Sequence, residues 1–599
     1  MHITDAHSSV LSEATKRKQQ PQQPRQLLSC TKCRERKCDR TKPCSACCAR
    51  GQPKDCHFIA EGGDYAPIQQ SYELRKLRTE NLRLKERLRA SKISIEDEDT
   101  DPAASPDSQL GDRPSSSQKR RTAKQRRFQG SEWQDSIYFG SPGLASVVID
   151  FAAVNMTPSP ASLAHLMPRG PDMYSPRNPP PHPFPTIFRA TPEECFPELL
   201  ECLPPREDLL EALSAFEKRV NVCSFPHVPF EITRGEVERF LDDERRNAEM
   251  YPDVLALLFA AIALGGQHSV WDKSGCQWDA MAVHDEAKRG NVYIAAAMQA
   301  LRLASFMHRP SLLCIQALIM IGPYLTNSGR FLDAWTLFGT TIRLAHSIGL
   351  HRHPKYLDPA PPTQRECFVR QTLWWWMLHM DEEYSMTLGR PLGISGIGDC
   401  PPPQELTTNP GMLRFGEFVN RFTILARQVL SSEKLTNAKI DDFTDQIRAL
   451  LETMPETLQF NNSWVRKDKE LPEWPLSAMA AVYHCKAHTY LILLNRQRVD
   501  KHATQTQKAN GSPLRGRALV LASSEEVVDA FLFLEEKVPA ALISWTMGQQ
   551  VFNSCMMIFL DAIEQRTLSS RSKKAEKAFV IFQELGHVHK LAGLAVERM

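Results

Sequence analysis

Apolar residues recur at the three- and four-residue steps of an α-helix from about residue 203 to the end of the chain, with almost no alternating strand pattern. The spacing predicts helices over residues 206–222, 252–266, 284–306, 311–326, 331–348, 364–387, 411–430, 437–453, 475–498, 523–536, 547–566 and 573–598. We therefore expect an all-α protein in which residues 201–599 form one large helical domain.

Local signals refine three of these helices. Thr363 and Glu366 form the signature of a capping box at the start of 364–387, and Gly329 separates 311–326 from 331–348 as a natural helix C-cap within a helical hairpin. The stretch "LWWWMLHM" (373–380) is apolar nearly all round, so we expect its three tryptophans to be core residues rather than a ligand cage. The acidic "HMDEE" (379–383) is expected on the exposed end of that helix.

The first 200 residues have a different character. Residues 1–25 are polar and rich in Gln, and residues 93–200 combine charge runs with Ser and Pro, so we expect a disordered N-terminus and a mostly disordered linker. Residues 26–60 hold a cysteine block and 72–92 a separate helix. Within the linker, "SIYFGSPGLASVVID" (136–150) is apolar enough to serve as an anchor packed on the later domain.

The helix at 72–92 carries the seam of a short coiled coil. Its a and d positions, at alternating three- and four-residue steps, are Leu74, Leu77, Asn81, Leu84 and Leu88. A lone Asn at an a position favours a parallel homodimer in register, and Glu73 and Glu80 would face Arg78 and Lys85 across the pair. The alternative is a single solvated helix, since two and a half heptads are marginal alone.

Charge and cysteine content separate the N-terminus from the body. The net charge is only +3, but from Lys16 to Cys56 twelve Lys and Arg face three acidic residues, an excess of +9, which indicates a polyanionic partner. The N-terminus has no apolar run, so we expect no signal peptide.

The apolar stretch at 254–266 is too short to cross a bilayer, so we expect a soluble intracellular chain with no membrane partner. In that compartment sixteen cysteines do not indicate a disulfide framework.

Seven cysteines lie between residues 30 and 56. Cys30 and Cys33, and again Cys44 and Cys47, are pairs spaced to place two thiolates on one tetrahedral metal, usually zinc. With Cys38 and Cys56, six thiolates can hold two zinc ions if two sulfurs bridge, and Cys48 is an extra thiol. The segment is too short for a core, so the metal must supply its folding energy. A generic zinc module of the RING kind is the alternative, but it needs a longer central span and normally a His.

The block resembles the six-cysteine, two-zinc binuclear cluster of fungal transcription factors. The shared features are CxxC, a basic run, "CDR", "KPCSAC" and a last Cys before "HF". The resemblance implies a short helix in the major groove of double-stranded DNA that reads CGG half-sites. It implies that Arg36 and Lys37 contact guanine edges. The other basic side chains are better placed to contact phosphates; they are Lys32, Arg34, Arg40 and Lys42.

The spacing departs from that family at one point. Four residues, "RERK", separate Cys33 from Cys38 where the family has six. Removing two helical residues turns the position of Cys38 by about 200° and shortens its reach by about 3 Å. Three explanations stay open: the helix unwinds to keep the ligand, the first zinc loses Cys38, or two residues were lost from the deduced sequence or by splicing. We favour the last because the pattern around the gap is intact.

The helical domain resembles the fungal-specific transcription factor domain, or middle homology region. The similar segments are "LLFAAIALGGQ" (257–267), 309–352, 373–395 and "DCPPP" (399–403), within about 200–410. The resemblance implies an all-α regulatory domain that contacts the transcription machinery and can receive a small-molecule effector, in a nuclear protein. "KRRTAKQRR" (119–127) fits a nuclear localisation signal or a solvated basic linker.

The sequence contains no catalytic constellation, and we expect no enzyme. His484 and His488 in "HCKAH" lie one helical turn apart, but a zinc protease needs Glu at 485, where this chain has Cys, so we interpret them as a helix face. The sequence therefore predicts a zinc-dependent, DNA-binding transcription factor for RNA polymerase II genes. The alternative is a regulatory or effector-sensing subunit that does not bind DNA because its cluster is defective.

The coiled coil makes the first testable prediction. Replacing Leu77 and Leu84 by Pro should abolish tight binding to a paired DNA site, because Pro breaks the helix that pairs the subunits. Gel-shift titrations on paired and single sites measure the effect. Unchanged binding of the variant to both sites would contradict the dimer.

Overall fold

The computed structural model describes residues 45–49, 143–144, 147–156, 191, 194–220, 228–271, 278–357, 362–403, 410–465, 470–472, 475–498 and 513–599. The chain divides into two units, residues 1–112 and 113–599. In the first, the described residues form one short helix, α1 (Ser45–Ala49). The predicted coiled coil, and every predicted zinc ligand and DNA contact except Cys47, lie outside the described residues.

The second unit is helical, and its described residues contain no strand. Its long helices in the first half are α7 (Arg206–Ala215), α9 (Arg234–Asp242), α10 (Glu244–Met250), α11 (Pro252–Ser269), α12 (Ala280–Leu303), α13 (Leu312–Asn327), α14 (Phe331–Ser347) and α15 (Gln364–Leu388). In the second half they are α16 (Pro410–Ser431), α17 (Asn437–Glu452), α18 (Leu476–Asn495), α19 (Gly516–Lys537), α20 (Trp545–Gln565), α21 (Ser570–Leu585) and α22 (Lys590–Arg598). The prediction of a large all-helical body is confirmed.

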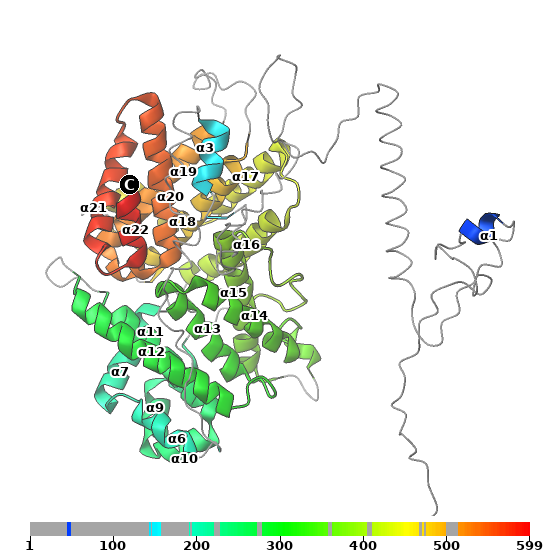
Figure 1. Cartoon of the computed structure of the whole chain (residues 1–599), viewed down its shortest axis with the longest axis vertical. Helices are drawn as coiled ribbons and strands as arrows, with labels where there is room; N and C mark the ends of the chain where they lie inside the picture. The colour runs from blue at the N-terminus through cyan, green and yellow to red at the C-terminus, as the bar shows by residue number, and fades with distance from the viewer. Residues whose placement is uncertain are drawn as a thin grey trace, which may run out of the picture. The chain divides into compact units, whose positions relative to one another are not determined.

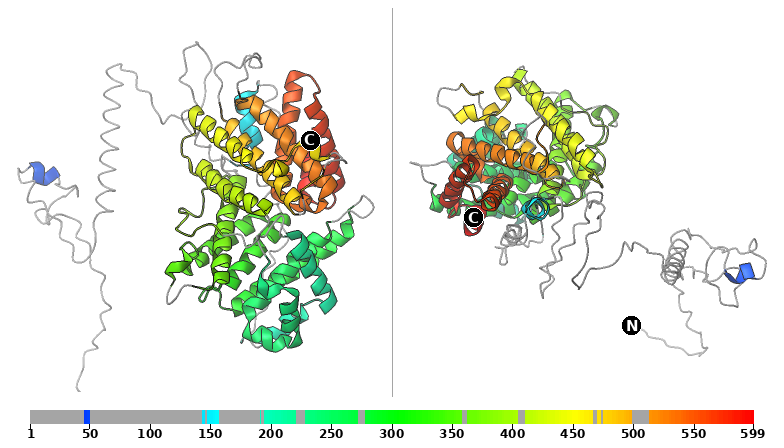
Figure 2. Two further views of the ribbon diagram at one scale, coloured as in Figure 1. Left: turned by 180° about the vertical axis from the view of Figure 1, so that it is seen from behind. Right: turned by 90° about the horizontal axis from the view of Figure 1, so that it is seen from above.

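Two groups of helices share this body (Figure 1). In the first, α11 packs against α7, α12 and α13; in the second, α19 packs against α18, α20 and α21. Helices α15 and α16 join them, since α15 contacts α13, α14 and α16 (Figure 2). The apolar core is continuous through both groups.

Helix α11 is the centre of the first group. Every residue from Leu255 to Gly266 is buried, as expected of a helix that is apolar all round. Gly265 allows the close contact with α7, because a Cβ there would lie 1.9 Å from the backbone oxygen of Ala212. No single helix in the described ranges is long and apolar enough to span a membrane; α10 and α11 meet that test only as a pair bent by 110°, on length and composition alone.

Local capping explains several helix ends. The Thr363 hydroxyl accepts from the Glu366 backbone N–H at 3.2 Å, so the predicted N-cap is confirmed. The Glu366 carboxylate does not complete the box, since Arg370 holds it at 2.8 Å. Gly329 and Gly389 end α13 and α15 with φ of 76° and 64°, left-handed values that favour Gly.

The structure departs from the predicted elements in three places. The predicted helix 573–598 is two helices, α21 and α22, because the chain turns at Gly586 to lay α22 against α20. Helix α19 begins at Gly516, earlier than the predicted 523. Helices α9 and α10 were not predicted, because their sequences are largely polar.

The segment before residue 201 contributes to the body. Helix α6 (Phe196–Glu201) and helix α3 (Val147–Asn155) carry buried residues of the same core. The Leu144 backbone N–H donates to the Met386 carbonyl at 3.0 Å, and Asn553 Nδ2 donates to the Leu144 carbonyl at 2.9 Å. Of the anchor expected over 136–150, residues 143–144 and 147–150 pack on the body and the rest lie outside the described residues; the helical body begins before the predicted boundary at 201.

The anchor predicts a measurable contribution to stability. Val148→Ala should lower the free energy of unfolding by about 1–3 kcal/mol, because it deletes two methyl groups from a buried site. Val580→Ala on α21 is the matched control. Val580 is half exposed, and the change from Val to Ala raises helix propensity by the same amount at both positions. Urea denaturation followed by circular dichroism measures both; equal shifts would contradict a packed anchor.

Candidate functional site

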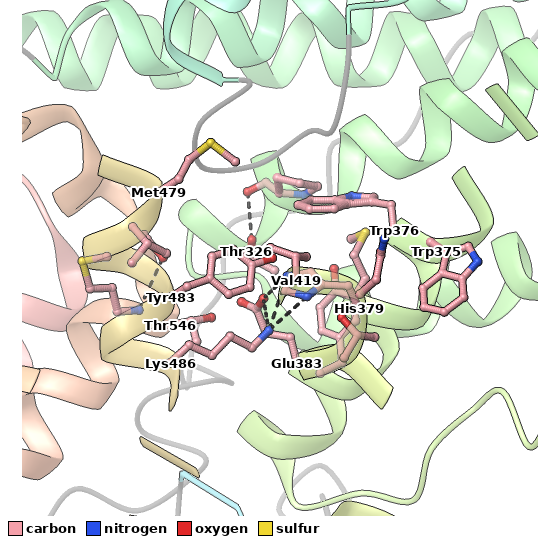
Figure 3. A pocket seen from close by; sticks show the side chains of 18 of the residues that line it. Thr326, Trp375, Trp376, His379, Glu383, Val419, Met479, Tyr483, Lys486 and Thr546 are labelled. Atoms are coloured by element: carbon pink, nitrogen blue, oxygen red, sulfur yellow. Dashed lines mark hydrogen bonds and ion pairs between the residues drawn. The ribbon is translucent and has the colours of Figure 1, made fainter. Parts of the chain in front are cut away.

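A cavity of about 260 Å³ lies between α15, α16, α18 and α20, with the end of α13 at its edge (Figure 3). Eight aromatic side chains line it, together with polar ones. The aromatic residues are Phe331, Phe368, Trp375, Trp376, Tyr384, Phe415, Tyr483 and Trp545. The polar side chains at the cavity include Lys486, Glu383 and His379, which Figure 3 shows gathered at one side.

The three tryptophans at 374–376 divide between core and cavity. Trp374 is fully buried and its Nε1–H donates to the Ile397 carbonyl at 2.7 Å. Trp375 and Trp376 are only partly buried and line the cavity, with Trp375 Nε1–H donating to the Cys400 carbonyl at 3.2 Å. The prediction of core residues is thus confirmed for Trp374. Trp375 and Trp376 pack against the core but also line the cavity.

Apart from the one-third exposed Glu383, the acidic stretch 379–383 is buried, so the expectation of an exposed helix end was wrong. Asp381 is 3% exposed and Glu382 is fully buried. These residues lie in the second half of α15, where α16 and α18 cover the helix and bring basic side chains to it. A buried carboxylate is costly unless it is paired and hydrogen-bonded, and both carboxylates are.

Arg427 of α16 neutralises Asp381. Its guanidinium lies 2.8 Å from the Asp381 carboxylate and also donates to the carbonyls of Leu378 and Ile394, at 3.1 and 2.5 Å. Asp381 in turn accepts from the backbone N–H groups of Gly393 and Ile394, at 2.8 and 3.0 Å. This network ties the segment after α15 to two helices. Just after α15, the Arg390 guanidinium lies over the Trp335 ring, 4.1 Å from its centroid.

Lys486 of α18 neutralises Glu382 beside the cavity. The ammonium forms an ion pair with Glu382 and lies 3.8 Å from Glu383, and the Tyr490 hydroxyl also donates to Glu382. Burial raises the pKa of Glu382, while Lys486 and Tyr490 oppose that shift. The network therefore holds one buried ion pair with a second, one-third exposed carboxylate at the cavity.

His379 stays neutral in this network. Burial, helped by the Lys486 cation, holds its pKa well below the ordinary value. Its Nδ1 lies 3.2 Å from the Lys486 ammonium and its ring stacks on Trp376 at 4.9 Å between centroids. A neutral imidazole offers one nitrogen that accepts a hydrogen bond, which suits the adjacent ammonium. The cavity thus offers aromatic surface, a fixed cation and a carboxylate, the features of a site for a small amphipathic molecule.

Of the cysteines predicted as zinc ligands, the structure describes Cys47 alone. Cys47 is buried in α1 while its neighbour Cys48 is exposed. Sequence reasoning did not find Arg427 or Lys486 as partners of the acidic stretch. The available signal was a basic residue among apolar neighbours in a predicted helix. Such a residue indicates a buried charge, but it does not identify which carboxylate pairs with it.

Comparison with known proteins points to transcription. The sequence profile of the fungal specific transcription factor domain matches residues 223–397. The chain is 25% identical over 140 residues to transcription factor yanR of Aspergillus niger, covering 23% of this chain and 17% of that protein. It is 22% identical over 312 residues to the C6 finger domain transcription factor hasF of Aspergillus fumigatus, covering 45% and 40%.

A third relative is an uncharacterised transcriptional regulatory protein, C3C7.04, of Schizosaccharomyces pombe, 36% identical over 87 residues, or 14% of this chain and 10% of that protein. The chain therefore spans less than half the length of each of these relatives. No solved structure matches the chain. The matches support a fungal transcription factor and a transcriptional regulator rather than an enzyme family.

The buried ion pair beside the cavity generates a prediction with a defined pH dependence. Lys486→Met should lower the free energy of unfolding by about 3–5 kcal/mol at pH 7.5, because Glu382 is left buried without a cation. The folded variant then binds a proton at Glu382 more tightly than the unfolded chain does, so the loss should shrink as the pH falls toward 5. Urea denaturation at both pH values measures it.

Two further variants make this test specific. Lys577→Met on the exposed face of α21 is the matched control and should change stability by less than about 0.5 kcal/mol. The double variant Lys486→Met/Glu382→Gln should recover most of the loss, because an amide still accepts from Tyr490 without a charge. A double variant as unstable as Lys486→Met would mean that packing, not charge, is responsible.

Proposed function

We propose that the chain is a sequence-specific, zinc-dependent, DNA-binding transcription factor that acts in the nucleus on RNA polymerase II genes. The observation that carries the proposal is the combination of the cysteine block at 30–56 with a fungal specific transcription factor domain at 223–397. A relative named as a C6 finger factor supports the same combination. Neither feature alone distinguishes this function from other zinc modules or other helical regulators.

The donor set fits two zinc ions. Two CxxC pairs with Cys38 and Cys56 supply six thiolates, and two zinc ions with six thiolates carry a net charge of −2 among lysines and arginines. The zinc would supply the folding energy of a segment too short for a core. The burial of Cys47 and the exposure of Cys48 support Cys47 as the ligand of that adjacent pair.

The DNA contacts follow from the resemblance and from charge. Arg36 and Lys37 would donate to O6 and N7 of guanine in CGG half-sites. The surrounding basic side chains, Lys32, Arg34, Arg40 and Lys42, would contact phosphates and make the binding salt-dependent. A homodimer through the seam at 74–88 would place two clusters on paired half-sites.

The helical body would be the regulatory part of this factor. Its cavity supports a role as the site of a small-molecule effector, because aromatic side chains combined with fixed polar groups are typical of ligand sites. Helices α15 and α18 both border the cavity, and the buried ion pair between Glu382 and Lys486 links these two helices. An effector there would bias the packing of those helices and so the contacts of the body with the transcription machinery.

The second candidate is a regulator that does not bind DNA. The observation that favours it is the four-residue span "RERK", which displaces Cys38 from the position that the family uses. Such a protein would keep the body and the dimer helix and would act by pairing with other subunits or by sensing an effector.

Cysteine substitution in the full chain tests the proposal. Cys47→Ser should lose bound zinc and weaken binding to a paired CGG duplex by at least 100-fold, because the thiolate completes the metal site. Cys48→Ser, one residue away and exposed, is the matched control and should keep both properties. Elemental analysis and salt-dependent gel shifts measure the outcome.

The same measurement separates the two candidates. Loss of sulfur-bound zinc in Cys47→Ser together with a salt-sensitive CGG preference in the parent chain supports the DNA-binding factor. A parent chain with fewer than two sulfur-bound zinc ions and no sequence preference supports the second candidate. Insertion of two residues after Lys37 should then restore the missing zinc if the shortened span is the cause.

A further inference from the structure

His484 and His488 lie together with a carboxylate of the next helix. Both histidines belong to α18, one turn apart, and their ring centroids are 4.3 Å apart. Glu526 of α19 reaches the same place, with its Oε2 3.0 Å from His484 Nε2. One nitrogen of each ring and one Glu526 oxygen all lie within 4.8 Å of one another.

This donor set suits a divalent transition-metal ion. Two imidazoles and one carboxylate are the protein ligands of many zinc sites that keep a fourth position for water. Ligand atoms around a tetrahedral zinc lie about 3.3 Å apart, given bonds of about 2.0 Å. The His484–Glu526 pair already has this spacing, so the remaining ligand needs to move by at most about 1.5 Å. Glu526 is more than one-third exposed and is free to make such an adjustment.

One of these two histidine rings also carries a nitrogen without a hydrogen-bond partner in the described part of the chain. His488 Nδ1 is buried and has no hydrogen-bond partner among the described residues. A buried polar atom without a partner is costly, and a metal ion or its bound water would remove that cost. Burial, with the neighbouring His484 and Arg448, also holds the pKa of His488 well below its ordinary value. The ring is therefore neutral, which is the form that binds a metal.

The charged residues around the site affect which metal ion it can bind. Glu526 supplies the negative charge, and Arg448 of α17 is the cation that faces His488 and opposes a dication. Phe460 closes one side, 5.0 Å from the His484 ring. Softer imidazole ligands with a single carboxylate select zinc over magnesium or calcium, which prefer oxygen-rich sites.

We propose that His484, His488 and Glu526 bind one zinc ion that bridges α18 and α19, in addition to any zinc held by the N-terminal cysteines. The ion would fix α18 against α19 only two residues from Lys486, which α18 presents at the cavity. The site would thus couple zinc availability to the rigidity of one cavity wall.

The experiment uses the full chain and Zn²⁺ or Co²⁺ as the probe. Glu526→Gln should lose one zinc equivalent relative to the parent chain, measured by elemental analysis after dialysis against zinc-containing buffer. In the cobalt-loaded protein, the lost absorbance should lie in the visible region and leave the near-ultraviolet sulfur-to-cobalt band unchanged. Glu526 is partly exposed, so this variant is expected to fold; His488→Ala should lose the same equivalent.

Controls separate this site from the cysteine cluster and from non-specific binding. His587→Ala, at an exposed histidine, should keep the full zinc content. Cys47→Ser should reduce the sulfur-to-cobalt band without removing the equivalent that depends on Glu526, so failure of the cluster proposal and failure of this one are distinct results. Equal zinc content in the parent, Glu526→Gln and His488→Ala chains would overturn the site.

Discussion

The pairing of Arg427 with Asp381 is the interaction on which the junction of the helical body depends. It neutralises a carboxylate buried in α15 with a guanidinium from α16, and the same guanidinium binds the carbonyls of Leu378 and Ile394. The pair therefore fixes the angle at which the chain leaves α15 and returns as α16. Since these two helices join the two groups of the body, this buried ion pair holds their junction, beside the Lys486–Glu382 pair between α15 and α18.

Helix α18 makes buried or part-buried polar contacts to three neighbouring helices. Lys486 pairs with α15, His484 bonds Glu526 of α19, and the Asn495 amide bonds Thr444 of α17 and the backbone of Gly516. Apolar packing alone would tolerate a rotation of such a uniformly apolar helix, because it has no strongly preferred face. These polar contacts point in different directions and leave α18 one orientation, which in turn shapes the cavity wall.

The sequence predicted those features whose causes are local. The periodicity of apolar residues placed most long helices, and Thr363 and Gly329 marked ends because capping involves only neighbouring residues. The charged stretch at 379–383 was misjudged because its partners lie far along the chain, Arg427 at a separation of 46 residues from Asp381 and Lys486 at 107 from His379. The cavity also forms between helices that are far apart in the sequence. Glu526, which lies beside His484 and His488, likewise comes from a different helix.

The break between α21 and α22 has both a local signal and a distant cause. Gly586 is a local stop signal within 573–598 that the prediction of one helix did not use. The turn arises because α22 gains contact with α20, where Leu591 fills the space that a side chain at Gly548 would need. Conversely, α9 and α10 are polar helices that bury only Val237, Phe240 and Ala248.

The anchor formed by residues 143–144 and α3 has a consequence for the synthesis of the protein. The Leu144 carbonyl is made 409 residues before the Asn553 amide that binds it. At about 5–20 residues per second, ribosomal elongation leaves the anchor without this partner for roughly 20–80 s. Throughout that interval the apolar side chains of Val148 and Phe151 are available to other chains, so the nascent protein is exposed to misassembly until α20 emerges. Closure of the body is thus one of the last events of biosynthesis.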